Sequence, residues 1–291
     1  MAATQEQLRA YVDYLRDMGV YDLYRIGEAI EADLPVTVAA AAPEPARPAI
    51  ARPSATPPVL NRETLPAPTH APSPLEASMP KPVSFNALAP LPELRIAVSE
   101  RPAALQAVRD EIGDCTRCPL AYAGRHKIVY GNGDAAARLM FVGEGPGADE
   151  DATGEPFVGK AGQLLNNMIN AMGLQREQVY VANIVKCRPP ANRVPEPVEA
   201  NTCSQFLLRQ IDIVQPKVIV ALGGTAATYL LGVKQSLASL RGNWYDVRGA
   251  KVAVTYHPAF LLRDPRQKGE AWKDLQRVMK QLGLEAPKRP S

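Results

Sequence analysis

Four short runs of apolar, mostly β-branched residues occur in the chain after residue 138. They lie at residues 139–143, 179–185, 218–223 and 252–256. Their hydrophobic positions are continuous instead of alternating with polar ones, which is typical of strands covered on both faces. The stretches between them, at 163–172, 197–215 and 225–231, are each able to form a crossover helix. This pattern predicts an α/β fold, a three-layer α/β/α sandwich with a central four-stranded, mainly parallel sheet.

The first third of the chain follows another pattern. Between Thr4 and Ile30 apolar residues recur at roughly helical spacing, which predicts a short N-terminal helical segment over residues 1–34. Residues 35–93 contain fifteen of the 28 prolines and few aromatic residues. Such a stretch buries too little apolar surface to offset its chain entropy, so we expect a disordered Pro/Ala-rich linker there. The third part, residues 94–291, is expected to be the globular domain.

The helical segment has two interpretations, a solubilising tail or a docking element that binds a partner through its apolar stripe. The sequence favours neither. No basic stretch followed by an apolar one marks a secretory leader, and no apolar run approaches the roughly 18 residues that a membrane span needs. We therefore expect a cytoplasmic protein with no membrane partner.

Charge divides along the same boundary. Residues 1–99 carry 8 Lys and Arg against 11 Asp and Glu, whereas residues 100–291 carry 25 against 19. The basic excess of the second part is compatible with a polyanionic partner, although many basic domains bind none.

The cysteines fall in the basic part. Cys115, Cys118, Cys187 and Cys203 are the only cysteines in the sequence, and the first two form a C-x2-C turn. In a cytosolic protein such cysteines are more often metal ligands than disulfides, so we expect one metal site that joins distant segments. Spacing alone leaves open whether that site holds zinc or an iron–sulfur cluster.

Polar and aromatic residues follow the predicted strands, where the sites of open α/β sheets lie. The first strand leads into a glycine-rich turn, 143–147, whose first carboxylate is Glu144, and Phe157 lies in a second glycine-rich loop. Asn183 lies near the end of the second strand, and its amide suits the edge of a nucleobase. His257 follows the fourth strand and precedes an apolar Phe-Leu-Leu and Arg263, a combination suited to entering a base stack.

Together these motifs resemble the family 4 uracil-DNA glycosylases, the iron–sulfur branch of the uracil-DNA glycosylase superfamily. The resemblance covers about residues 114–283. Its parts are, in order, the C-x2-C pair, GEGPG at 143–147, GEPFVGKAG at 154–162, ANIVKCRPP at 182–190, Cys203 and HPAFLL at 257–262. One such motif is unspecific, but six in the expected order are not.

The resemblance implies a 4Fe-4S cluster on the four cysteines. We expect its role to be structural, with a redox role as the alternative, because no sequence feature requires redox chemistry. It also implies that Asn183 hydrogen-bonds the uracil edge, that Phe157 stacks on the ring and that the backbone at Gly145 contacts the base. His257 would donate a hydrogen bond to the uracil O2. The carboxylate that handles the water maps to Glu144, with Glu150 as a second candidate.

The DNA contacts follow in the same way. Leu261 would fill the gap left in the duplex, with Arg263 beside it. We expect the cluster to hold Lys186, Arg188 and Arg193 near the phosphate backbone. We expect a monofunctional DNA repair enzyme that flips uracil out of DNA and hydrolyses its N-glycosidic bond, leaving an abasic site.

Two alternatives remain at this stage. One is a non-catalytic, metal-stapled nucleic-acid-binding module. The other is a sister branch that traps its product covalently through a histidine, which the absence of histidine from residues 186–197 disfavours. Besides uracil-containing DNA, a repair or replication protein is a candidate partner if the N-terminal segment is a docking element, and we expect the catalytic domain to be monomeric.

Overall fold

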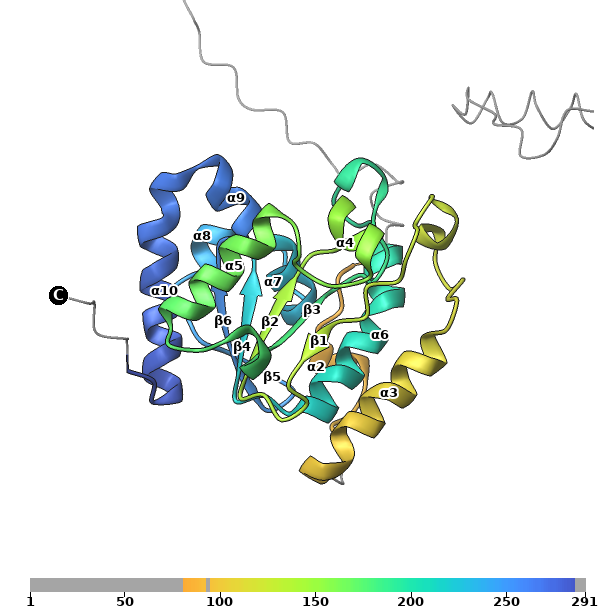
Figure 1. Ribbon diagram of the computed structural model, residues 1–291, viewed down its shortest axis with the longest axis horizontal. Coiled ribbons are helices and arrows are strands. Elements are labelled where there is room, and N and C mark those ends of the chain that lie inside the picture. Colours follow the sequence, from red (N-terminus) through yellow and green to blue (C-terminus); the bar gives the residue numbers. More distant parts are fainter. Residues whose placement is uncertain (1–80, 93–94, 286–291) are drawn as a thin grey trace, which may run out of the picture. The chain divides into compact units, whose positions relative to one another are not determined.

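The computed structural model describes residues 81–92 and 95–285 (Figure 1). The helical segment expected over residues 1–34 and the expected linker up to residue 80 lie outside the described residues.

The described residues contain one sheet of six strands in the order β1-β3-β2-β4-β6-β5. The strands are β1 (Asn132–Gly133), β2 (Leu139–Gly143), β3 (Tyr180–Asn183), β4 (Val218–Leu222), β5 (Tyr245–Val247) and β6 (Ala250–Thr255). The inner four are parallel, and β1 and β5 are antiparallel edges. The expected α/β fold with a mainly parallel sheet is confirmed, but four was the wrong number of strands. The edge strands have two and three residues, too few to leave an apolar run in the sequence.

Helices cover both faces of this sheet, as Figure 1 shows. The α-helices of the described residues are α2 (Phe85–Leu88), α3 (Arg101–Ile112), α4 (Ala148–Thr153), α5 (Lys160–Ala171), α6 (Pro197–Val214), α7 (Gly224–Leu231), α8 (Leu237–Leu240), α9 (Pro258–Arg263) and α10 (Lys268–Leu282). Short 3₁₀ turns lie at Val98–Glu100, Pro119–Tyr122, Arg176–Gln178, Pro190–Asn192 and Pro265–Gln267. The three crossover helices expected from the sequence correspond to α5, α6 and α7.

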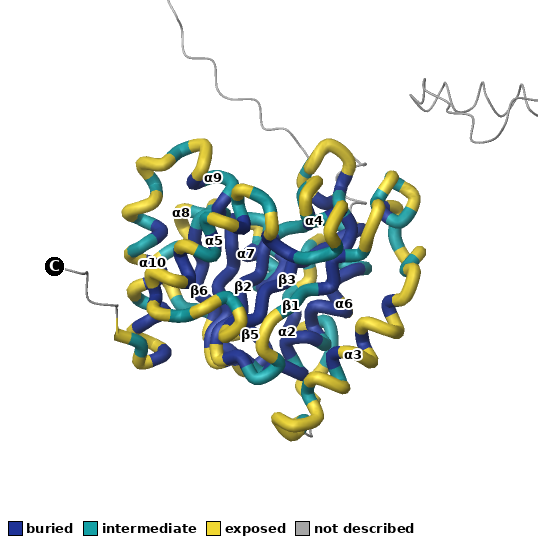
Figure 2. The backbone as a smooth tube through the Cα atoms, viewed as in Figure 1, coloured by how far each residue is buried: buried dark blue, intermediate teal, exposed yellow. Residues whose placement is uncertain are grey.

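Alternating residues of β2, one of the two innermost strands, point to opposite faces of the sheet, and the apolar interior therefore consists of two cores. Met140 and Val142 pack with residues of α3, α6 and α7 on one face, and Leu139 and Phe141 pack with residues of α5 and α10 on the other. Figure 2 shows the strands as the buried centre between helices whose outer surfaces are exposed. Burial on both faces explains why each inner strand is a continuous apolar run.

Part of the expected linker packs on the domain. Ser84 caps α2, and Phe85 in that helix is 0% exposed and belongs to the first core. The guanidinium of Arg248 donates to the backbone oxygens of Ala89 and Pro90. Residues 81–92 thus belong structurally with the globular domain, although the sequence pattern places them in the linker.

No helix among the described residues is long and apolar enough to cross a membrane.

Candidate active site

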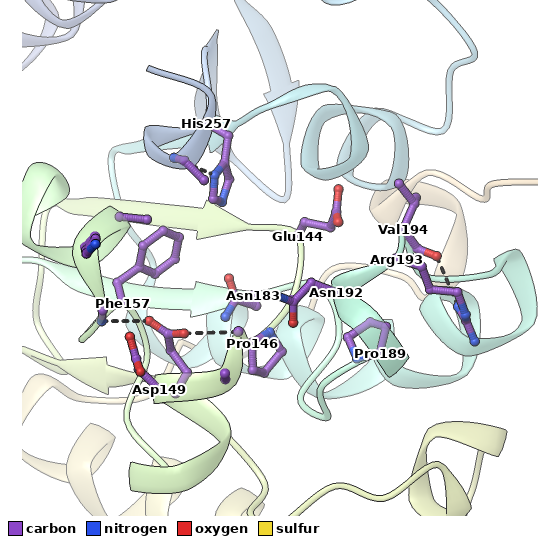
Figure 3. A pocket seen from close by; sticks show the side chains of 18 of the residues that line it. Glu144, Pro146, Asp149, Phe157, Asn183, Pro189, Asn192, Arg193, Val194 and His257 are labelled. Carbon is purple, nitrogen blue, oxygen red and sulfur yellow. Dashed lines mark hydrogen bonds between the residues drawn. The ribbon is translucent and has the colours of Figure 1, made fainter. Parts of the chain in front are cut away.

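A pocket of about 570 Å³ opens at the carboxyl ends of the parallel strands. Of the residues expected in the site, Glu144, Gly145, Glu150, Phe157, Asn183, His257 and Arg263 line it. They come from the end of β3, from the loops after β2, α4 and β6, and from α4 and α9, so the fold brings together positions spread over 120 residues. Figure 3 shows the labelled side chains of Glu144, Phe157, Asn183 and His257 around one open space.

Asn183 ends β3 and lies directly beside Gly143 of β2 in the parallel register. A Cβ atom on residue 143 would lie 2.4 Å from the Asn183 Oδ1 and 2.6 Å from the Phe157 ring, so glycine is required there for close packing. Asn183 is 1% exposed, and within the described residues its Oδ1 has no hydrogen-bond partner. A buried amide oxygen without a partner costs about 1–3 kcal/mol, which a ligand with an N–H group would recover.

Phe157 holds its ring against the same pocket. Its backbone has φ of 57°, in the left-handed region that a bulky residue rarely adopts. The ring is largely buried, and its centroid lies 5.6 Å from that of the His257 imidazole. This strained turn aims a flat apolar surface into the pocket, which suits stacking on a planar ligand.

His257 is the N-cap of α9, and Pro258 at the first helical position favours this start. The Nδ1 atom accepts a hydrogen bond of 3.1 Å from the backbone N–H of Ala259. Burial, reinforced by the positive charge of Arg263, lowers the pKa of His257 to about 4. The imidazole is therefore neutral near pH 7, with its proton on Nε2, where it can act as a hydrogen-bond donor.

Glu144 follows β2 and is half-buried at the pocket wall. Burial raises the pKa of its carboxyl group, and a hydrogen bond from the side chain of Thr225 partly offsets this effect. Thr225 lies near the start of α7, the helix that follows β4. Sequence reasoning missed this residue, although its place after a predicted strand is the signal that marked the other site residues.

Glu150, the second candidate for handling water, is engaged elsewhere. Its Oε2 accepts from the backbone N–H of Gly147 at 3.0 Å, and its Oε1 accepts from Val158 and Gly159 at 2.9 and 3.1 Å. The carboxylate therefore holds the two glycine-rich loops together, whereas that of Glu144 does not bind either loop. This geometry favours Glu144 for the water.

The four cysteines converge on a second, small cavity. All of them lie in the described residues and are free thiols. Burial raises the pKa of Cys187 to about 11 and of Cys203 to about 12. Three N–H groups point at sulfur atoms, from Arg125 to Cys187, from Arg117 to Cys115 and from the backbone of Lys186 to Cys203, at 3.3–3.5 Å.

Among the described residues, no group of three or more His, Cys, Asp and Glu side chains is spaced to hold a single metal ion. A 4Fe-4S cluster gives each of four thiolates a different iron atom, so the relevant test is whether four thiols face one cavity. They do, and N–H donors at the sulfur atoms favour the thiolate form that binds iron. The donor set fits the cluster.

The expected position of the wedge requires correction. Leu261 is 1% exposed and packs in the second core, so it is not placed to enter a duplex. Its neighbour Leu262 is 43% exposed and precedes the exposed Arg263 at the pocket rim. The sequence gives the apolar pair but not the rotation of a six-residue helix, which decides which leucine faces the core.

The expected phosphate contacts also change. Lys186 is 1% exposed, so it cannot reach a DNA backbone, and burial lowers the pKa of its ammonium group to about 8. Arg188 is half-buried and donates to the Asn192 Oδ1 at 2.8 Å. Arg193, on the same loop, forms two hydrogen bonds with the buried Glu199 at 2.7 and 2.8 Å. These interactions fix the loop over the pocket.

Comparison with known proteins agrees with this arrangement. The family model of the uracil DNA glycosylase superfamily matches residues 130–276. The chain belongs to the uracil-DNA glycosylase superfamily.

Its relatives define the branch. A type-4 uracil-DNA glycosylase of Thermotoga maritima is 49% identical over 162 residues, which cover 55% of this chain and 84% of that protein. Type-4 enzymes of Archaeoglobus fulgidus and Pyrobaculum aerophilum are 40% and 42% identical over 61% and 59% of this chain and 92% and 91% of their own lengths. Family 4 is therefore the branch to which the sequence belongs.

Proposed function

We propose that this protein is a DNA repair enzyme that flips uracil out of DNA and hydrolyses its N-glycosidic bond, leaving an abasic site. The observation that carries the proposal is the pocket in which an unpartnered Asn183 oxygen, an aromatic ring and a neutral histidine face one space. The reaction has three requirements, and residues that line this pocket meet each of them.

The first requirement is to recognise the base. Uracil presents an N–H donor and a carbonyl acceptor on its pairing edge, and the Asn183 amide offers the complementary acceptor and donor. Cytosine presents the opposite arrangement, which would leave the buried amide unpaired. Phe157 supplies the stacking surface that replaces the neighbouring base.

The second requirement is to stabilise the leaving group. Uracil departs as an anion while the sugar becomes positively charged, so hydrogen-bond donors aimed at the base oxygen lower the barrier. Nε2 of His257 is such a donor.

The third requirement is a water molecule and a negative group near the sugar. Glu144 lies on the pocket wall, and its raised pKa makes it a better proton acceptor than an ordinary glutamate. The carboxylate would orient and deprotonate the water that attacks C1′. Its charge would also favour the positively charged sugar.

The four cysteines would hold the 4Fe-4S cluster, which supplies structural cross-linking of the segments around residues 115 and 187–203 when bound. The second of these segments begins four residues after the end of β3 and includes the loop over the pocket. The cluster thus supports the pocket without taking part in bond cleavage.

The direct test uses the purified holoprotein and oligonucleotides that differ in one base. Incubation with a uracil-containing strand, followed by hot alkali, should break that strand at the uracil, whereas strands with thymine or cytosine at the same position should stay intact. An intact uracil strand at enzyme excess, with tight binding retained, would instead indicate a binding module without catalysis.

Glu144→Gln is expected to lower the single-turnover rate about 10²- to 10⁴-fold, as loss of a general base does. The wild-type rate should fall on acidification as Glu144 becomes protonated, at a pH above that of an ordinary glutamate, because burial raises its pKa. The residual rate of the variant should lack this limb and decline only near pH 4, where His257 gains its proton. A pH profile of both proteins checks this, and an unchanged acidic limb in Glu144→Gln would assign it to another group.

A further inference from the structure

Lys186 is a buried charge next to the pocket that the mechanism above does not use. Its Nζ donates to the backbone oxygen of Asn183 at 2.9 Å and to the Oε1 of Gln210 at 2.7 Å. An ammonium group is taken out of water at a cost of several kcal/mol unless such partners compensate it. Its place inside the fold is therefore defined by these two oxygens.

Gln210 is itself fully buried in α6 and cannot move freely. Its Nε2 donates to the backbone oxygen of Tyr130 at 2.9 Å and to the hydroxyl of Tyr180 at 3.1 Å. Both of its side-chain polar atoms are thus used, and the amide orientation that presents Oε1 to Lys186 is fixed. The network connects α6 to β3 beneath the pocket.

The same lysine touches the cysteine site through its backbone. Its N–H donates to the Sγ of Cys203 at 3.3 Å, and the next residue is Cys187. Three residues, 184–186, separate Asn183 from Cys187. Lys186 binds the Asn183 backbone oxygen through its side chain and the Cys203 sulfur through its backbone N–H. The short segment that joins Asn183 to Cys187 is therefore also linked to Cys203 of α6.

We propose that Lys186, held by Gln210, is a positioning residue that fixes the Asn183 amide in register with the uracil edge. The inference deepens the proposed function and rests on it. The hydrogen bond to the Asn183 backbone oxygen restrains the end of β3 from the side of α6. The backbone N–H groups of Ile184 and Val185 then make the last bonds to the neighbouring segment, at the oxygens of Gly143 and Glu144. A catalytic group displaced by about 1 Å can lose about 10²-fold in rate, so such a restraint has a measurable effect.

The sharpest experiment compares two changes at position 210. Gln210→Leu and Gln210→Glu both remove the amide donor to Tyr130 and Tyr180, but only Gln210→Glu keeps an oxygen for Lys186. Gln210→Leu should lower kcat about 10- to 100-fold with little change in KM for a uracil oligonucleotide, and Gln210→Glu should retain most of the rate. Equal losses in both variants would mean that the network is only structural, and the proposal would be wrong.

A double-mutant cycle locates the effect. Lys186→Met should lose about as much rate as Gln210→Leu, but it should add about twofold or less in an Asn183→Ala background, because the group it positions is gone. The matched control is Arg248→Met, which removes another buried cation, at the amino end of β6, and should lower Tm without lowering kcat. Full additivity of Lys186→Met and Asn183→Ala would overturn the proposal.

Two readouts do not depend on excision. Iron content per chain should stay unchanged in both Gln210 variants, and a loss of iron with the rate would place the effect at the cysteine site instead. The side-chain amide NMR signal of Asn183, assigned by its disappearance in Asn183→Ala, should shift in Gln210→Leu and stay in place in Gln210→Glu. That comparison decides the positioning role even if the wild-type protein fails to release uracil.

Discussion

Asn183→Ala is expected to release uracil about 10²- to 10³-fold more slowly than the wild-type protein, the usual cost of removing one preorganised hydrogen-bonding group from an active site. The loss should appear in kcat, because the amide acts on the flipped base and not on the DNA backbone. Single-turnover excision from a uracil oligonucleotide measures it.

Asn166→Ala is the matched control. This asparagine of α5 is half-buried, and like that of Asn183 its Oδ1 lacks a hydrogen-bond partner among the described residues, but it does not line the pocket. Its variant should excise uracil at the wild-type rate. If the Asn183→Ala protein were folded and as active as the wild-type protein, Asn183 would not be the residue that recognises the base.

Cys203→Ser should lose its iron and much of its stability. A cross-link across the 68 residues between Cys118 and Cys187 is worth on the order of 4 kcal/mol in loop-closure entropy. Its loss would lower Tm by about 10 °C for a domain of this size. Iron analysis, the visible absorbance of the cluster and thermal unfolding check this expectation.

Ser204→Ala provides the comparison, since Ser204 is the next residue of α6, is buried and donates to the backbone oxygen of Ala200 at 2.6 Å. It should keep its iron and lose no more than about 1 kcal/mol of stability. If Cys203→Ser kept both its iron content and its Tm, the four cysteines would not form one site.

The inner strands could be predicted because burial on both faces makes each of them a continuous run of apolar residues in the sequence. The same logic located the pocket, since parallel strands end at one edge and Glu144, Asn183 and His257 each lie at or just after a strand end. The edge strands β1 and β5 were missed because two or three residues have no periodicity.

Side-chain environment was the harder part. Lys186 reads as a surface cation in the sequence, yet the buried oxygens that bind it come from Asn183 and from Gln210, 24 residues away. Leu261 and Leu262 differ only in the face of α9 on which they lie. The environment of Glu150 could not be predicted for the same reason. Its hydrogen-bond partners in the second glycine-rich loop come close only in the folded chain, and no spacing in the sequence marks them.

His257 has two roles, because it caps the N-terminus of α9 and also faces the pocket as a hydrogen-bond donor. The Nδ1 atom that accepts the hydrogen bond from the Ala259 N–H is also the atom that a second proton would occupy. Protonation of His257 in acid would therefore remove the N-cap of α9 and add a charge to the hydrogen-bond donor in one step. Below about pH 4 the first turn would begin to fray just as the imidazole gains its charge. Acid inactivation should therefore be accompanied by local unfolding, visible as faster amide exchange at Ala259, before the rest of the domain melts.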